Sequence, residues 1–449
     1  MRLYSTLSRT YEEVPQGSEI KIYVCGVTPY SRSHLGHAMS AIVFDVLRRY
    51  LEFRGEKVRH VSNYTDIDDR LIDRAPQEGT TVKELAERHI AQLEAEFRGL
   101  NILRPHVTPR ATEEIDGMIE IIRSLVEKGV AYESQGDVYY RVRSWADYGK
   151  LSGKKVDELR AGARVEVGEL KDDPVDFALW KAAKPGEPSW DSPWGKGRPG
   201  WHIECSAMAQ RYLGETLDIH GGGEDLIFPH HENEIAQSEA YSGKPFSRIW
   251  MHHGWMQLSG EKMSKSLGNI ISIEEGLQRY GPDAIRLFIV NSHYRKPLAY
   301  SEEGLEGAKS AAERLRTAAR RQGGADEEGP DPAPYRERFI EAMEDDLNTA
   351  GALGVLFDLS REINRSLDEG HGVGQAQQSL IELAGILGLK LQDERRDGDL
   401  GPFIDLLIEL RGELRGARQY ELADLLRDRL AGLGVTIEDT PAGTEWRLG

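Results

Sequence analysis

The segment that decides the fold is KIYVCGVTPYSRSHLGHAMSAIVFDVLRRYLEFRGEKVRHVSNYT, residues 21–65. Its first five residues alternate, with Ile22 and Val24 on one side, which predicts a short strand. Apolar residues then recur at helical spacing from about residue 35 to residue 54, and Gly55 follows as a C-terminal stop. Residues 58–65 predict a second strand. A strand, a helix and a strand in this order open a parallel α/β layer.

Beyond this segment the α/β pattern is interrupted and then resumes. The stretch 184–200 is rich in Pro, Gly and Trp and is therefore predicted to be loop. Regular patterns lie on both sides of it, with helices at 82–99, 112–128 and about 232–241, and strands at 132–143 and 217–220. We predict one α/β Rossmann-like domain, 1–120 and 195–256, split by an inserted connective segment, 121–194.

The rest of the chain is predicted to be mainly helical and to hold further units. Helical patterns dominate 257–320, and the polar linker QGGADEEGPDPAP follows at 322–334. A helical bundle is predicted at 335–391. A charged break separates the bundle from a small α+β tail at 400–449.

Composition indicates a soluble globular protein. Hydrophobic residues make up 39% of the 449, and no apolar run is long enough to span a membrane. The N-terminus lacks the apolar core of a signal peptide, so we expect a cytoplasmic protein. Its two cysteines, Cys25 and Cys205, exclude a disulfide scaffold and leave inert thiols, a reactive thiol or metal ligands as alternatives. The net charge of −18 does not favour a nucleic-acid partner, although phosphate contacts need only a local basic cluster.

The tetrapeptide His34-Leu35-Gly36-His37 stands at the start of the first predicted helix. A helix N-terminus presents free N–H groups and partial positive charge, which suit a phosphate. Gly36 lets a base or phosphate approach the backbone, and the imidazoles can donate hydrogen bonds to charge that develops during nucleotidyl transfer. The alternative is an incidental pair of histidines.

A second motif, Lys262-Met263-Ser264-Lys265-Ser266, lies far downstream in a polar, basic segment that is predicted to be a loop. Lys262 and Lys265 can clamp a triphosphate and stabilise the negative charge that moves onto pyrophosphate. A solvated basic loop is the alternative.

A third set of residues, scattered along the sequence, has the chemistry of a metal site. His230 and Glu234 are four residues apart on a predicted helix, so they face the same way. Cys25 ends the first strand, and Cys205 follows the Pro- and Gly-rich stretch. Two thiols, an imidazole and a carboxylate make a tetrahedral zinc set. Spacing alone leaves two buried thiols as the alternative.

The two motifs together resemble the signature pair of class I aminoacyl-tRNA synthetases, with Leu35 where that family most often has Ile. The segments CGVTPY (25–30), GWHIECSAM (200–208) and GGGEDLIFPHHENEIAQSEA (221–240) are similar to those of the cysteine-specific members. The resemblance covers nearly the whole chain. It implies ATP-dependent attachment of L-cysteine to the cysteine tRNA through a cysteinyl-adenylate, with Mg²⁺ accompanying ATP.

The resemblance also implies roles for individual residues. It makes Cys25, Cys205, His230 and Glu234 the ligands of one zinc ion per subunit, with His231 as the rival of His230. Zinc favours a thiolate, so this ion would distinguish cysteine from serine, which an apolar pocket separates poorly. The remaining ATP contacts implied in this way are His34, Gly36, His37, His220, Asp225, Lys262 and Lys265. Thr65, at the end of the second predicted strand, is a candidate contact for cysteine, and Trp201 is a candidate wall of its pocket. In the tail, Arg427 and Trp446 are candidate tRNA contacts, because they suit a phosphate and an unpaired base.

Ordinary structural roles are the alternatives for the less specific of these residues. Thr65 precedes three aspartates that also fit a solvated acidic turn, Trp201 fits a core position, and Asp225 fits a cap. For the tail that carries Arg427 and Trp446, the alternative is a small capping domain.

By the same resemblance, 257–320 is the KMSKS loop with a helical stem-contact region, and 400–449 is an anticodon-binding domain. A monomer is expected. Two competing interpretations are a relative in the mycothiol pathway that joins cysteine to an amino sugar, and a catalytically silent binding paralogue. The anticodon-type tail argues against the first, and the intact motifs argue against the second.

Overall fold

A computed structural model describes residues 1–158, 170–258, 261–262, 271–322, 329–391, 401–440 and 443–448. The chain divides into two compact units, Met1–Leu391 and Gln392–Gly449. Within the described ranges no helix is both long and apolar enough to cross a membrane.

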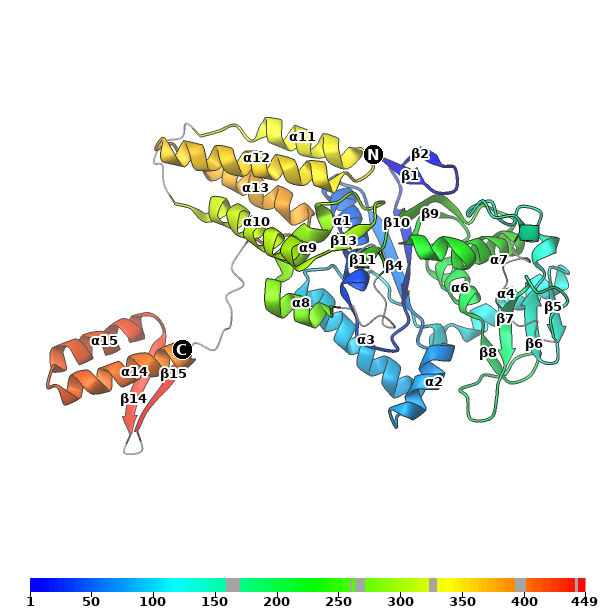
Figure 1. Cartoon of the computed structure of the whole chain (residues 1–449), viewed down its shortest axis with the longest axis horizontal. Coiled ribbons are helices and arrows are strands. Elements are labelled where there is room, and N and C mark those ends of the chain that lie inside the picture. Colours follow the sequence, from blue (N-terminus) through cyan, green and yellow to red (C-terminus); the bar gives the residue numbers. More distant parts are fainter. Residues whose placement is uncertain are drawn as a thin grey trace. The chain divides into compact units, whose positions relative to one another are not determined.

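A four-stranded parallel sheet forms the centre of the first unit (Figure 1). Its order is β10-β9-β3-β4, made by β3 (Ile20–Val27), β4 (Val58–Tyr64), β9 (Leu217–Gly223) and β10 (Ser247–His253). β3 pairs in parallel with both β4 and β9, so strands from distant parts of the sequence lie side by side. This confirms the predicted α/β layer, although the sequence patterns did not identify β10.

Helices cover both faces of this sheet and create two cores. α1 (Leu35–Phe53) packs with the helices that follow the sheet, and its buried face joins Ile22 and Val24. On the other face, Tyr23 and Cys25 join α4 (Ile115–Glu127), α6 (Trp201–Leu213) and α7 (Glu232–Ser242). The alternation read from the sequence thus places successive β3 residues in different cores.

Three strands of the inserted segment and one strand just after it form a four-stranded antiparallel sheet. They are β5 (Ala131–Ser134), β6 (Asp137–Tyr140), β7 (Phe177–Ala182) and β8 (Gly197–Pro199). β8 lies inside the stretch predicted to be loop, and that prediction is wrong for these residues. The reason is non-local, because β8 gains its hydrogen bonds by pairing with β7.

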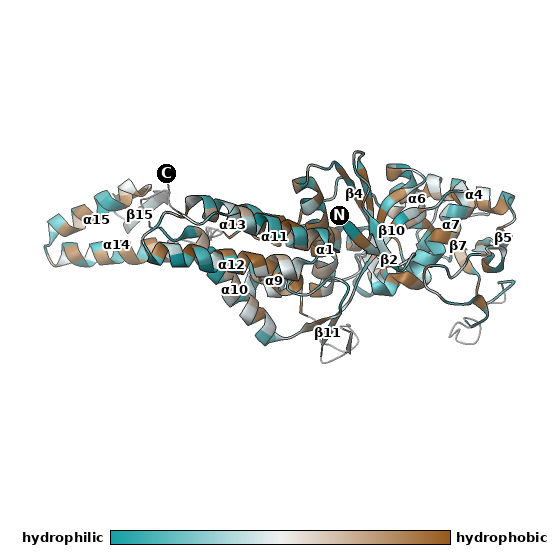
Figure 2. Cartoon of the chain, turned by 90° about the horizontal axis from the view of Figure 1, so that it is seen from above, coloured by the Kyte–Doolittle hydropathy of each residue, from teal (hydrophilic) through white to brown (hydrophobic). Residues whose placement is uncertain are grey.

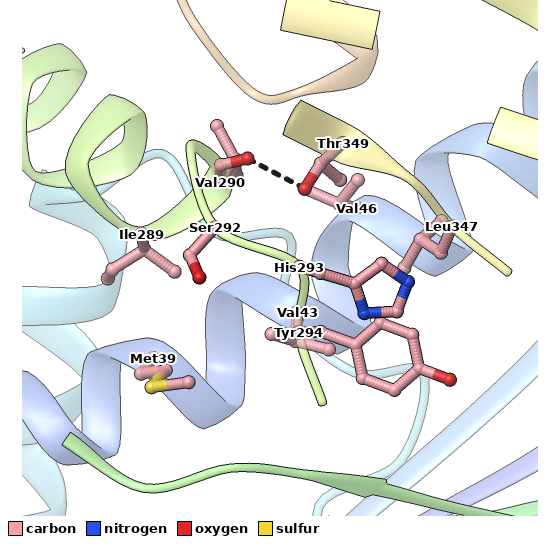
Figure 3. A pocket seen from close by; sticks show the side chains of 10 residues that line it. All are labelled: Met39, Val43, Val46, Ile289, Val290, Ser292, His293, Tyr294, Leu347 and Thr349. Carbon is pink, nitrogen blue, oxygen red and sulfur yellow. Dashed lines mark hydrogen bonds between the residues drawn. The ribbon is translucent and has the colours of Figure 1, made fainter. Parts of the chain in front are cut away.

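The helices after the sheet share one core with α1 rather than forming a separate core. They are α8 (Ile273–Tyr280), α9 (Pro282–Val290), α10 (Glu302–Arg320), α11 (Ala333–Glu344), α12 (Thr349–Asp368) and α13 (Gly374–Ile386). Figure 2 shows hydrophobic and hydrophilic residues alternating along them, as expected for helices with one buried side. A small pocket lined mainly by apolar side chains remains where α1, α9 and the start of α12 meet (Figure 3).

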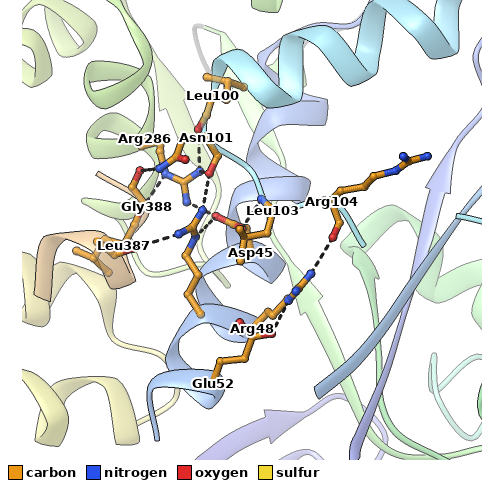
Figure 4. Close-up of polar contacts among 12 residues, drawn as sticks. Asp45, Arg48, Glu52, Leu100, Asn101, Leu103, Arg104, Arg286, Leu387 and Gly388 are labelled. Atoms are coloured by element: carbon orange, nitrogen blue, oxygen red, sulfur yellow. Dashed lines mark hydrogen bonds and ion pairs between the residues drawn. The ribbon is translucent and has the colours of Figure 1, made fainter. Parts of the chain in front are cut away.

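A buried ion pair fastens α1 to these helices (Figure 4). Arg286 on α9 is fully buried and pairs with Asp45 on α1. Its guanidinium also donates to the carbonyl oxygens of Leu387 and Leu100, both at 2.9 Å. Each nitrogen of the buried guanidinium therefore has at least one acceptor, and extensive hydrogen bonding is the condition under which such a pair is tolerated.

The remaining described strands and α-helices of the first unit lie outside the central sheet, and several of them add residues such as Leu3, Leu93 and Met256 to the core on the α1 side. They are β1 (Arg2–Ser5), β2 (Thr10–Glu13), α2 (Asp69–Gln77), α3 (Val82–Gly99), β11 (Met256–Leu258), β12 (Glu261–Lys262) and β13 (Leu298–Tyr300). Lys262 was predicted to lie in a loop, and this is wrong for its backbone, because β12 pairs with β11.

The second unit is a small α+β structure, as predicted. It consists of α14 (Gly401–Gly416), α15 (Tyr420–Gly432), β14 (Val435–Thr440) and β15 (Gly443–Leu448). The two strands pair antiparallel, and Ile404, Leu430 and Val435 form a core of their own.

Candidate metal and nucleotide site

Four buried side chains from four different elements meet beside the central sheet. Cys25 comes from β3, Cys205 from α6, His230 from the turn before α7, and Glu234 from the first turn of α7. One ligand atom of each lies within 4.8 Å of those of the others. The Glu234 carboxylate is 3.3 Å from the Cys25 sulfur and 3.0 Å from Nε2 of His230. The structure thus brings together all four predicted metal ligands.

A second set overlaps the first and shares Cys25 and Glu234 with it. In this set His220 and His231 take the places of Cys205 and His230. Nε2 of His231 is 3.3 Å from the Cys25 sulfur, and Nε2 of His220 is 2.9 Å from Oε2 of Glu234. His231 therefore remains a rival ligand on geometric grounds.

The protein environment favours the ionised forms of Cys205, His230 and Glu234 at this cluster, but not that of Cys25. A hydrogen bond with Cys25 lowers the pKa of Cys205 to about 6 against the opposing effect of burial, whereas burial and Cys205 raise that of Cys25. Burial lowers the pKa of His230, but the charges of Glu234 and Cys205 outweigh this effect and raise it to about 10. Burial likewise opposes ionisation of Glu234, yet His220 and His230 lower its pKa to about 2. A buried thiolate and carboxylate suit a divalent cation that replaces the protons.

Further aromatic side chains support the two candidate histidine ligands. Nδ1 of His202 lies 2.9 Å from Nδ1 of His230, and the Trp201 ring stacks on His230 with centroids 4.2 Å apart. Nδ1 of His231 similarly lies 2.8 Å from Nε2 of His252. The sequence did not single out His202 or His252, since only the fold brings them to the cluster. Trp201 is 39% exposed, so it does not occupy a core position.

A pocket extends from the cluster to the start of α1. Cys25 lies on its wall together with His34, Gly36, His37 and Asp225. The sequence analysis singled out each of these five residues, and the structure places them around one cavity. A ligand in this pocket can therefore touch the metal cluster and the HLGH motif at the same time.

The two histidines of this motif are held by their own helix. His34 caps α1, because its Nδ1 accepts the N–H of Gly36 at 3.1 Å. Nδ1 of His37 accepts the N–H of His34, also at 3.1 Å, and the two rings stack with centroids 3.9 Å apart. With both Nδ1 atoms acting as acceptors, the proton of each neutral ring sits on Nε2.

The other predicted site residues of the first unit are placed as follows. Thr65 is buried just after β4, and Asn63 donates to its hydroxyl at 3.3 Å. His220 does not line the pocket; it is fully buried and stacks on Trp250. The backbone of Lys262 lies in β12, whereas Lys265 lies outside the described residues.

The two predicted tRNA contacts lie in the second unit. Arg427 on α15 is 3.8 Å from Asp424 and 3.6 Å from Asp428. Trp446 on β15 packs against the small core and donates its indole N–H to Asp405 at 2.9 Å. Both predicted roles stay predictions.

The chain is similar to known proteins along its whole length. Residues 11–310 match the family of tRNA synthetases class I (C) catalytic domain, and residues 338–392 match the DALR domain. The chain is 54% identical over 455 residues to the cysteine–tRNA ligase of Dehalococcoides mccartyi, covering 100% of this chain and 99% of that one. It is 50% identical to the Pseudomonas aeruginosa cysteine–tRNA ligase, with the same coverage.

Solved structures extend the likeness at the level of the fold. Mycobacterium tuberculosis methionyl-tRNA synthetase in complex with methionyl-adenylate superposes with a TM-score of 0.59 at 16% identity, covering 87% of this chain and 94% of that one. At this identity the likeness shows a shared fold alone.

Proposed function

This chain belongs to the cysteine–tRNA ligase family of class I aminoacyl-tRNA synthetases, and from that premise we propose that it activates L-cysteine with ATP and transfers it to the cysteine tRNA. In the first step the cysteine carboxylate attacks the α-phosphorus of ATP, and pyrophosphate leaves. In the second step a ribose hydroxyl at the tRNA end attacks the carbonyl carbon of the cysteinyl-adenylate, and AMP leaves.

The observation that carries this proposal is the pocket that Cys25 shares with His34 and His37. Adenylate formation requires the amino acid and the α-phosphate to lie next to each other. At one end of the pocket lies a set of metal ligands, and a bound zinc ion there would attract a thiol. At the other end lies a helix N-terminus, which suits a phosphate, so cysteine and ATP are supported as joint occupants.

The donor set fits zinc, because two cysteine sulfurs, an imidazole and a carboxylate converge in a buried space. Cys25, Cys205, His230 and Glu234 would hold the ion, one per chain. When bound, zinc would supply a centre that prefers the sulfur of cysteine to the oxygen of serine. Trp201, stacked on His230 and partly exposed, would close the side of the amino-acid site, and Thr65 would contact the substrate.

The residues at the start of α1 would act on the phosphates. Nε2 of His34 and of His37 would donate hydrogen bonds to charge that develops on the α-phosphate, and Gly36 would admit the nucleotide close to the backbone. Lys262 and Lys265 would neutralise pyrophosphate, with Mg²⁺ entering on ATP. These donors would bind the transition state more strongly than the bound ATP, which would lower the barrier to adenylate formation.

Other contacts rest on the family resemblance. Asp225 on the pocket wall would bind the ribose hydroxyls, whereas His220, which does not line the pocket, would support the site without touching ATP. Arg427 and Trp446 would meet the tRNA at the anticodon end. We further propose a monomer that works in the cytoplasm.

The test is cysteine-dependent charging of cysteine tRNA by the purified, zinc-loaded chain, measured beside cysteine-dependent ATP–pyrophosphate exchange. We expect both activities, and we expect serine to support neither. Exchange without charging would contradict tRNA as the acceptor and would favour a ligase that uses an amino sugar. Absence of both activities would favour a binding protein.

A further inference from the structure

The strand that carries Cys25 is irregular at that residue. Val24 of β3 pairs with Ser62 of β4, but the next pair is Val27 with Tyr64. Two residues of β3, Cys25 and Gly26, therefore face one residue of β4, Asn63. This is a β-bulge, a feature that re-aims side chains and is common beside active sites.

The packing of β3 agrees with the bulge. Val24 and Val27 both contact the core on the α1 side of the sheet, whereas Cys25 belongs to the core on the other side. In a regular strand, residues three apart point to opposite faces. The extra residue thus lets β3 keep its valines in one core while Cys25 faces the metal cluster.

Asn63 satisfies the backbone that the bulge leaves out of the ladder. It is 1% exposed, and its Oδ1 accepts the N–H of Gly26 at 2.9 Å and the Tyr23 hydroxyl at 3.1 Å. A backbone N–H can only donate, so the contact with Gly26 fixes which end of the amide is oxygen. The other end, Nδ2, donates to the Thr65 hydroxyl at 3.3 Å.

The backbone of Asn63 also lies very close to the bulge at Gly26. A Cβ at Gly26 would lie 1.5 Å from the Asn63 carbonyl oxygen, so only glycine fits opposite it. The Cys205 sulfur lies 3.7 Å from Oδ1 of Asn63. One buried side chain therefore touches Cys205, the bulge next to Cys25, and Thr65.

We propose that Asn63 is a positioning residue that sets the metal ligand Cys25 and the substrate contact Thr65 in one fixed relation. The inference deepens the proposed function and rests on it. Asn63 would touch neither the metal nor cysteine, and it would act by holding the bulge closed and by orienting the Thr65 hydroxyl. Residues that orient metal ligands in this way typically account for about 10–100-fold in metal affinity.

The test uses the full chain loaded with Co²⁺, whose absorption reports sulfur ligands. Asn63→Leu keeps the size of the side chain and removes its hydrogen bonds with Gly26, Tyr23 and Thr65. We expect its Co²⁺ affinity, measured against a competing chelator, to fall about 10-fold or more, and its KM for cysteine to rise by a similar factor. The KM for ATP should stay within about twofold, since the HLGH motif is held by its own helix.

Two matched variants separate the contacts. Tyr23→Phe removes the second donor to Oδ1 and a hydroxyl that also contacts Cys205, but it leaves the bond between Asn63 and Gly26 in place, so Co²⁺ affinity should fall less than in Asn63→Leu. Thr65→Val removes the hydroxyl, so it should raise the KM for cysteine while leaving Co²⁺ affinity unchanged.

Unchanged Co²⁺ affinity in both Asn63→Leu and the smaller Asn63→Ala would overturn the inference. So would a parallel loss of Co²⁺ affinity, ATP binding and thermal stability, or failure of Asn63→Ala to fold, because each assigns Asn63 to general folding. If the unaltered chain binds no Co²⁺, the proposed metal site itself is wrong, and that failure is visible before any substitution is made.

Discussion

Two pairs of histidines stand near helix starts in this chain, and the fold holds them in opposite ways. His34 and His37 line the pocket and accept hydrogen bonds from their own helix backbone. His230 and His231 are buried and meet side chains from β3, α6 and β10. The first pair is organised locally and the second by tertiary packing. The comparison suggests that phosphate chemistry and amino-acid selection can be damaged separately.

The largest expected effect is on amino-acid selection. Cys205→Ser replaces a metal-binding sulfur with a poor zinc ligand. We expect the KM for cysteine in pyrophosphate exchange to rise about 100-fold or more, with a much smaller change in the KM for ATP.

The neighbouring variant Ser206→Ala is the matched control for Cys205→Ser. Ser206 is buried on the same helix and accepts a hydrogen bond from Gln237 at 2.9 Å, but it belongs to neither metal set. Its KM for cysteine should change little. Equal rises in the KM for cysteine and the KM for ATP in Cys205→Ser would contradict separate roles for the two histidine pairs.

A substitution in the local pair should produce the opposite pattern. His37→Leu removes a donor for transition-state charge, so kcat for exchange should fall about 100-fold. Zinc content, measured by elemental analysis, should remain one ion per chain because His37 is held within α1. Loss of zinc from this variant would mean that the two regions are not independent.

A smaller effect, on zinc affinity, is expected when the residue that contacts His230 of the buried pair is replaced. His202 lies against the ring nitrogen of His230 that faces away from Glu234. His202→Phe keeps an aromatic ring but removes this contact, so zinc affinity in a chelator competition should fall about 10-fold. An unchanged affinity would favour His231 over His230 as the ligand.

The smallest effect is on stability. His34 accepts the hydrogen bond of an N-cap, so His34→Ala should lower the free energy of unfolding in urea by about 1 kcal/mol. His34→Ser restores a capping oxygen and should recover most of that loss. Both variants should lose exchange activity alike, because neither keeps Nε2. Recovery of exchange activity in His34→Ser would mean that His34 acts only as a helix cap and not as a donor to the phosphate.

The sequence predicted the local features well. The bounds of α1 and the strands on either side of it follow from periodicity and end signals over neighbouring residues, whereas the capping role of His34 emerged only from the structure. The position of the HLGH motif at the N-terminus of α1 could also be predicted from neighbouring residues, and with it a role in binding phosphate. The i+4 spacing of His230 and Glu234 likewise indicated that they face one point.

Features made by distant pairing could not be predicted. β8 forms only because β7 lies beside it, and β10 joins the sheet through β9. The approach of Cys25 to Cys205 was given by family resemblance, since spacing carries no information over such a separation. His202 and Asn63 gain meaning only from neighbours that the fold supplies, and a bulge in β3 leaves no pattern in the sequence.

The buried cluster of Cys25, Cys205, His230 and Glu234 is proposed to select cysteine through a metal ion. The most direct measurement is the absorption of the Co²⁺-loaded chain during titration with cysteine and, separately, with serine. We expect the sulfur-to-cobalt charge-transfer intensity to rise with cysteine and not to change with serine. Identical spectra in the presence and absence of saturating cysteine would contradict it.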